Sequence, residues 1–181
     1  MLFYKTCTLE NMSNFHIRRA TAEDAEGVKA VHITGWREAY HHVLPADFLD
    51  QLDSHIDVER WRRTLADHNT TAFVATTTTN NPQIVGWLTA GTAQEVVDAP
   101  TQLELQGLYI TAQWYGSGVA HALVTAGIGN QDAYLWVLKD NPRAQAFYRK
   151  EGFDLDGAEK FMSLGPAEVE IARMTRIREE P

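Results

Sequence analysis

Apolar residues recur along the chain with two periods, which separate the expected helices from the expected strands. A spacing of three and four residues predicts a helix starting at Thr21, with Asp24 as its capping partner. Its buried face comprises Ala25, Val28, Val31, Gly35 and Ala39. A short helix is expected from Pro45. A further helix is expected from about Ser54, with an inner stripe formed by Val58, Trp61 and Leu65.

Shorter apolar runs predict strands. The first is Phe15 to Arg19, and the next two, Thr71 to Thr76 and Ile84 to Ala90, flank a polar stretch ending in Asn-Asn-Pro. This stretch is predicted to be a hairpin loop rather than a domain boundary. The segment from Ala133 to Leu138 is apolar throughout, as expected of a strand buried on both faces. Two last strands are expected around residues 163–166 and end near Arg176.

The strand predicted from Leu103 to Ile110 contains a change of parity. Leu103 and Leu105 share one parity, and Leu108 and Ile110 share the other. The change falls at Gln106-Gly107, and a slip of one residue at a glycine is typical of a β-bulge. A bulge leaves backbone groups unpaired, so a ligand can meet them here.

The order of these elements predicts one mixed α/β domain. Its sequence is strand, helices, three strands, helix, strand, helix and two strands. The domain is expected to span residues 15–177, after a mobile extension of residues 1–14 and before a tail of residues 178–181. Met12 is hypothesised to begin the functional domain.

The composition of the chain excludes several classes of protein. The 181 residues are 44% hydrophobic and 22% charged, which excludes a long disordered chain. The net charge of −8 argues against nucleic acid as a partner, although backbone amides can still hold a small anion. Cys7 is the only cysteine, so an intramolecular disulfide and a cysteine zinc site are excluded, and a cytoplasmic location is expected. No apolar run approaches the roughly 20 residues of a membrane helix, so no membrane partner is expected.

A glycine loop is the strongest local signal for ligand binding. Gly116 and Gly118 allow close backbone approach, and they lead into a helix ending at Gly129, with inner residues Val119, Leu123 and Ala126. The first amides of such a helix form a cradle for an anion. The loop lacks the Gly-Lys-Ser/Thr of a Walker motif, and His121 stands where a dinucleotide fingerprint has its third small residue. A tight strand–helix turn without a ligand is the alternative.

Two blocks together resemble a known family. Gln113-x-x-Gly116-x-Gly118-x-Ala120 resembles the Q/R-x-x-G-x-G/A signature of the GNAT superfamily of N-acetyltransferases. Asn141-x-x-Ala144-x-x-Phe147-Tyr148-x-x-x-Gly152-Phe153 is similar to the next motif of that superfamily. The resemblance runs from about Ile17 to Arg176. Within it, Trp36-Arg37-Glu38-Ala39-Tyr40 followed by Leu44-Pro45 resembles a subgroup of small bacterial-type members.

The resemblance implies a mostly antiparallel sheet flanked by helices, with two splayed parallel strands that hold acetyl-CoA. The backbone of residues 108–110 would pair with the pantetheine arm, and the amides of residues 115–120 would hold the pyrophosphate. The cofactor-binding residues implied are Leu108, Tyr109, Ile110, Gln113, Tyr115, Gly116, Ser117, Gly118, Val119, Ala120, Asn141, Ala144 and Tyr148. Two positions depart from the family pattern, since Ser117 replaces a common basic residue and Ala112 replaces a common proline.

Acetyl transfer requires a base, because an amine is mostly protonated at neutral pH, and it benefits from an acid that protonates the departing thiolate. The resemblance gives the acid role to Tyr148, whose alternative is packing beside Phe147. It gives the base role to Glu104, whose alternative is an ordinary solvated carboxylate. Asn141 is expected to cap the helix that begins with Pro142, a role compatible with a contact to coenzyme A.

The acceptor is expected to be a primary amine of a small molecule or peptide, acetylated directly without a covalent enzyme intermediate. Trp36 and Tyr40, together with Glu104, are the candidates for its pocket, although an aromatic pair at that spacing also suits a core. No metal is expected, because the adjacent His41 and His42 are badly spaced for chelation. A homodimer is expected. The alternative function is a noncatalytic acyl-CoA-binding sensor or interaction module.

Overall fold

The computed structural model describes residues 14–93 and 98–178, so the predictions about Cys7, Met12 and most of the two termini fall outside it. The described residues form a sheet of seven strands in the order β1-β2-β3-β4-β5-β7-β6. The strands are β1 Phe15–Arg19, β2 Thr70–Thr77, β3 Ile84–Thr92, β4 Leu103–Ile110, β5 Ala133–Leu138, β6 Asp154–Leu164 and β7 Ala167–Arg176. Neighbours pair antiparallel except β4 and β5, which run parallel. The predicted mixed, mostly antiparallel α/β fold is confirmed.

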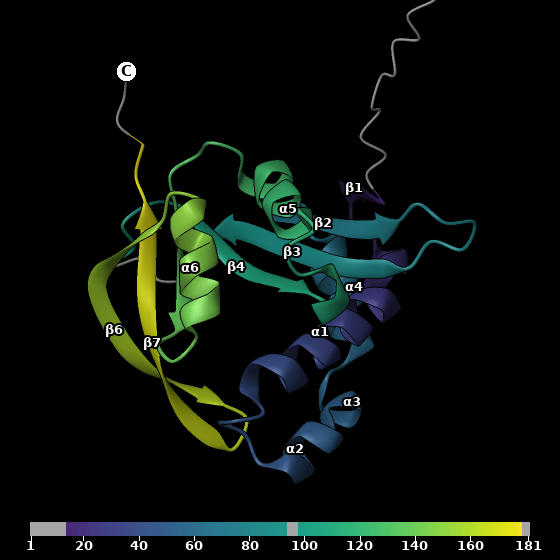
Figure 1. Cartoon of the computed structure of the whole chain (residues 1–181), viewed down its shortest axis with the longest axis horizontal. Coiled ribbons are helices and arrows are strands. Elements are labelled where there is room, and N and C mark those ends of the chain that lie inside the picture. Colours follow the sequence, from purple (N-terminus) through teal and green to yellow (C-terminus); the bar gives the residue numbers. More distant parts are fainter. Residues whose placement is uncertain (1–13, 94–97, 179–181) are drawn as a thin grey trace, which may run out of the picture.

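Helices cover both faces of the sheet (Figure 1). Helices α5 and α6 share a core with one face, while α1 and α4 pack on the other. The helices are α1 Ala25–Tyr40, α2 Ala46–Asp50, α3 Leu52–His55, α4 Val58–Ala66, α5 Val119–Ile128 and α6 Pro142–Lys150. Successive side chains of each strand point to opposite faces of the sheet and pack into the two cores. Leu88 therefore faces α5, and Trp87 faces α1.

The start of the first helical segment and its cap are as predicted, because Thr21 precedes the 3-10 turn Ala22–Asp24, Asp24 completes the capping box, and α1 continues from Ala25. Two details of the other predicted helices are wrong. Helix α4 begins at Val58 instead of Ser54, because the Asp57 side chain accepts a hydrogen bond of 2.9 Å from the Glu59 amide and caps it there.

The second error concerns which side of α5 is buried. Ala126 is exposed, whereas Val124 and Ile128 are buried with Leu123. The aliphatic residues at 119, 123, 124 and 128 define the inner stripe, and the small Ala126 lies outside it.

Strands β4 and β5 separate next to the predicted bulge. Thr89 pairs with Gly107 and Ala90 pairs with Leu105, which leaves Gln106 as the extra residue and confirms the bulge. Between β4 and β5 a single pair, Glu104 and Tyr134, is in register within the described residues. Beyond it β5 pairs only with β7, so the sheet opens between two adjacent strands. This opening creates the space for a ligand.

Candidate functional site

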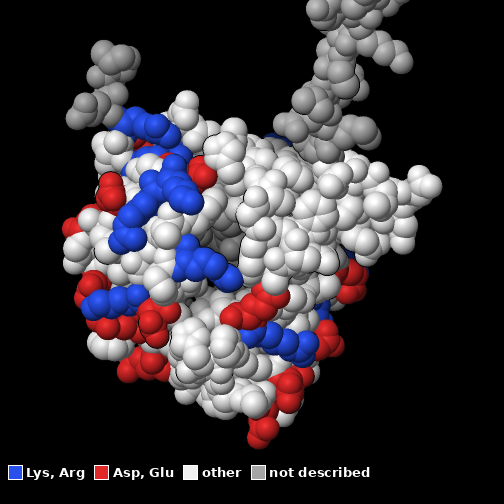
Figure 2. Space-filling view, in the orientation of Figure 1, with Lys and Arg blue, Asp and Glu red and all other residues white. Residues whose placement is uncertain are grey.

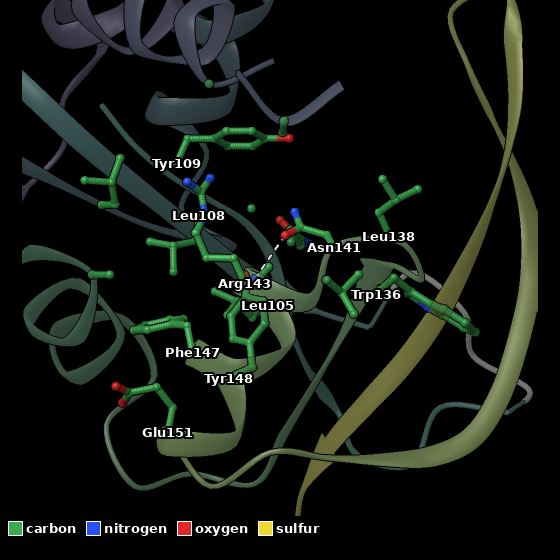
Figure 3. A pocket seen from close by; sticks show the side chains of 18 of the residues that line it. Leu105, Leu108, Tyr109, Trp136, Leu138, Asn141, Arg143, Phe147, Tyr148 and Glu151 are labelled. Atoms are coloured by element: carbon green, nitrogen blue, oxygen red, sulfur yellow. Dashed lines mark hydrogen bonds between the residues drawn. The ribbon is translucent and has the colours of Figure 1, made fainter. Parts of the chain in front are cut away.

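A cleft of about 760 Å³ opens where β4 and β5 diverge. Its walls come from both faces of the sheet, namely the end of α1, the strands β4 to β7, the glycine loop and α6 (Figure 3). The close view places Phe147, Tyr148 and Glu151 on one side, and Tyr109, Leu138 and Trp136 on the other. A volume of this size is typical of a site for a small molecule or cofactor.

The glycine loop leaves backbone amides available at the cleft. Gly116 and Gly118 have φ angles of +74° and +91°, and a Cβ built on either would meet no atom within 4 Å. Within the described residues, the amides of Gly116, Gly118 and Ala120 have no acceptor, whereas those of Ser117 and Val119 donate inside the loop. Alternate amides therefore remain free for an anion, and the open space fits the pyrophosphate that the resemblance implies.

A basic side chain of α6 lies beside this loop. The Ser117 hydroxyl donates a hydrogen bond of 2.6 Å to the Trp114 carbonyl. The Arg143 guanidinium instead lies 4.1 Å from the centroid of the Tyr115 ring and donates to its hydroxyl at 3.1 Å. Figure 2 shows basic side chains gathered over α6. Arg143 was not singled out in the sequence, because only the fold shows that the first turn of α6 faces the loop.

Tyr148 lines the cleft from α6. Its ring packs against Phe147 and Phe153, with centroids 5.3 and 6.0 Å away. Burial raises the pKa of Tyr148, and the neighbouring Tyr40 raises it further. The hydroxyl therefore stays protonated at neutral pH.

Glu104 also lines the cleft, on the strand β4. The hydroxyl of Tyr134 donates to its Oε2 at 3.1 Å, across the registered pair that joins β4 to β5. Tyr134 is fully buried, so its ring and hydroxyl are held by the core. Sequence reasoning missed Tyr134, although a tyrosine within an aliphatic buried strand is a signal that its hydroxyl needs a partner.

Trp36 and Tyr40 both line the cleft from α1 and also pack on the core cluster beside β5 to β7. The hydroxyls of Tyr40 and Tyr109 lie 3.1 Å apart. Burial raises the pKa of both tyrosines. The aromatic pair therefore belongs both to the core and to the lining of the cleft.

The remaining predicted cofactor residues divide into two groups. Those that line the cleft are Leu108, Tyr109, Ile110, Tyr115, Gly116, Gly118, Ala120, Asn141 and Ala144. Gln113, Ser117 and Val119 do not line it, and the Val119 side chain is fully buried in the core. The Asn141 side chain accepts from the Ala144 amide at 3.0 Å, so it caps α6 as predicted.

Neither a membrane-spanning helix nor a cluster of metal ligands is found in the described residues. No helix of residues 14–93 and 98–178 has the length and apolar character needed to cross a bilayer. The same residues contain no group of three or more His, Cys, Asp or Glu side chains that could hold a metal ion.

Replacing Gly118 by alanine tests the cradle. The positive φ angle disfavours any Cβ, so we expect a loss of about 1 kcal/mol of unfolding free energy and coenzyme A binding weakened about tenfold. Gly157 is the matched control, because its φ is +90° and its Cβ also meets no atom within 4 Å, yet it does not line the cleft. Gly157→Ala should cost similar stability and leave calorimetric affinity for coenzyme A unchanged. Equal affinities for both variants would contradict the role of the loop.

Comparison with known proteins agrees with this geometry. Residues 34–153 match the model of the acetyltransferase (GNAT) family. The Uncharacterized N-acetyltransferase YuaI of Bacillus subtilis (strain 168) is 27% identical over 136 residues, covering 70% of this chain and 73% of that protein. The Probable N-acetyltransferase Rv2775 of Mycobacterium tuberculosis is 25% identical over 150 residues, covering 80% and 83% of the two chains.

Solved structures share the fold. A histone acetyltransferase HPA2 and related acetyltransferase from Corynebacterium glutamicum superposes with a TM-score of 0.66 at 17% identity, over 93% of this chain and 98% of the other. The PaiA N-acetyltransferase of Thermoplasma acidophilum, solved in complex with coenzyme A, gives a TM-score of 0.62 at 16% identity, over 87% and 97%.

Proposed function

Because the chain belongs to the acetyltransferase (GNAT) family and is an N-acetyltransferase, we propose that it transfers the acetyl group of acetyl-CoA directly to a primary amine of a small molecule or peptide. The observation that carries this proposal is that one cleft joins the amide cradle to both Glu104 and Tyr148. A sensor that only binds an acyl-CoA needs the cradle but neither of these side chains.

The proposal includes the residues that would hold the donor, and the lining of the cleft supports this choice. The amides of Gly116, Gly118 and Ala120 would receive the pyrophosphate, and Arg143 would add a positive charge beside it. The backbone of residues 108–110 lines the cleft and would pair with the pantetheine arm. When bound there, acetyl-CoA supplies the activated thioester.

Glu104 and Tyr148 would divide the proton transfers between them. Glu104 accepts a proton from the acceptor ammonium, directly or through water, and frees the nitrogen lone pair. Bond formation between nitrogen and the acetyl carbon is accompanied by cleavage of the carbon–sulfur bond. Tyr148 gives its hydroxyl proton to the departing sulfur and is reprotonated by the second proton that the nitrogen loses as the amide forms, and Glu104 releases its proton to solvent. Donors beside the bulge at Gln106 stabilise the oxygen of the acetyl group.

The proposal also covers where the protein acts and what it binds. We expect a cytoplasmic enzyme without nucleic acid or membrane partners, acting as a homodimer. Sedimentation of the purified protein tests the homodimer.

Glu104→Gln tests the base. The amide keeps the shape of the side chain and can still meet Tyr134, but it cannot accept the ammonium proton. We expect kcat/KM to fall about 100-fold and the acidic limb of its pH profile to flatten. Release of coenzyme A thiol measures the rate with a panel of amines. Glu168→Gln, an exposed change outside the cleft, should leave the profile as in the wild type. An unaltered acidic limb in Glu104→Gln would remove Glu104 from the role of base.

A further inference from the structure

The cleft has two chemically different halves. The cradle half contains the polar loop and the pair formed by His121 Nδ1 and Glu151, whose atoms lie 2.9 Å apart. The other half is the part of the cleft where Figure 3 shows Tyr109, Leu138 and Trp136. Its lining is mostly apolar or aromatic, comprising Trp36, Tyr40, Tyr109, Trp136, Leu138, Met162, Leu164, Val169 and Ile171 together with Lys160.

Strand register explains why this half is apolar. Leu138 on β5 is paired with Ile171 on β7, and Val169 on β7 is paired with Met162 on β6. Paired residues of adjacent strands point to the same face of a sheet, so three strands present aliphatic side chains to the cleft together. Trp36 and Tyr40 on α1 face them, in contact with each other at a ring separation of 5.3 Å.

The charged side chains in this half of the cleft favour an acceptor with a single ammonium group. Of the described carboxylates that line the cleft, Glu151 belongs to the cradle half, so Glu104 is the one near the apolar wall. At the wall itself, the Lys160 Nζ lies 4.0 Å from the centroid of the Trp136 ring. A second positive charge on the acceptor would meet apolar side chains, and this contact is unfavourable.

Resting on the proposed function, we propose that the acceptor is a primary monoamine with an apolar body, such as an arylalkylamine or alkylamine, rather than a polyamine or an aminoglycoside. The ammonium group binds at Glu104, and the apolar body lies against Trp136, Leu138 and Ile171.

A matched pair of acceptors tests this inference. Hexylamine and 1,5-diaminopentane have the same length, and they differ in ending with a methyl or a second ammonium group. With saturating acetyl-CoA, we expect kcat/KM by thiol release to be at least about tenfold higher for hexylamine, because burying the second charge is unfavourable. An equal or higher value for the diamine would overturn the inference and leave the proposed function standing.

A binding measurement separates the two proposals when no amine is turned over. Quenching of tryptophan fluorescence by hexylamine in the coenzyme A-saturated protein, with no quenching by the diamine, would support the apolar subsite and contradict the enzymatic role of the cleft. Absence of both turnover and hexylamine binding would overturn the subsite.

Two neighbouring residues of β6 give matched variants. Met162 lines the cleft and is 38% exposed, whereas Phe161 points to the opposite face and is 67% exposed, so both sites tolerate a charged residue without loss of the fold. Met162→Glu should shift the kcat/KM ratio at least about tenfold toward the diamine, and Phe161→Glu should leave the ratio unchanged. An unchanged ratio in Met162→Glu would contradict the placement of the apolar body.

Discussion

Tyr148→Phe is expected to lower kcat about 100-fold while coenzyme A affinity stays within about twofold of the wild type. The phenyl ring keeps the packing against Phe147 and Phe153, so the wall of the cleft is preserved. The change removes only the proton that the hydroxyl would give to the departing sulfur. Because burial raises the pKa of Tyr148, the wild-type hydroxyl does not ionise near neutral pH, and the rate lost on substitution is the full contribution of the acid.

Three measurements separate this effect from damage to the fold. The free energy of unfolding of Tyr148→Phe should stay within about 1 kcal/mol of the wild-type value, because the substitution removes no buried carbon atom. Calorimetry should give nearly the same affinity for coenzyme A, and thiol release at saturating acetyl-CoA should give the reduced kcat. An undiminished kcat in a variant that binds normally would assign the acid to another group.

Local features of the site could be predicted from the sequence because each depends on residues close together in the chain. The parity change at Gln106-Gly107 predicted a bulge that the pairing of β3 with β4 confirms. The Asn141 cap needs only the Ala144 amide three residues later. The boundary of α4 was predicted wrongly because Asp57 caps the helix, which therefore starts at Val58, four residues after Ser54.

Contacts between distant elements were not predictable in the same way. The hydrogen bond from Tyr134 to Glu104 joins residues 30 positions apart and requires β4 and β5 to be adjacent and parallel. The chain from Arg143 through Tyr115 to Glu38 joins α6, the loop and α1 by hydrogen bonds of 3.1 and 2.6 Å. Periodicity indicates which face of an element is buried, but it does not say which other element covers that face.

His32 on α1 is an example in the core of contacts that periodicity does not predict. Its ring lies 5.2 to 5.6 Å from the rings of Trp36, Tyr109, Trp61 and Trp87. Among the described residues, both ring nitrogens are buried without a hydrogen-bond partner. Burial, with a smaller effect from the charge of Arg60, lowers the pKa of His32 to about 4. The fold therefore holds this imidazole in its neutral form.

His32→Phe is expected to remove a large part of the acid sensitivity of the fold. Because the folded pKa is below the unfolded value, the unfolded state binds more protons between these two values, and stability falls as the pH decreases from about 6.5 to about 4. The loss is about 2 kcal/mol at pH 5 and about 3 kcal/mol once both states are protonated. Phenylalanine keeps the ring contacts and does not titrate, so the variant should lose about 2 kcal/mol less than the wild type between pH 7 and pH 5.

Urea unfolding at pH 7 and pH 5 measures this difference directly, since each protein serves as its own reference. Asp24 also loses stabilisation in acid, because hydrogen bonds from Arg18 and Thr21 outweigh its burial and lower its pKa, but this loss is common to both proteins and cancels. The exposed His68 provides the control, and His68→Gln should follow the wild-type pH dependence. Should His32→Phe lose as much stability as the wild type on acidification, the proton uptake would have to occur at another group. A smaller loss would identify His32 and the aromatic cluster around it as a source of the acid sensitivity of the fold.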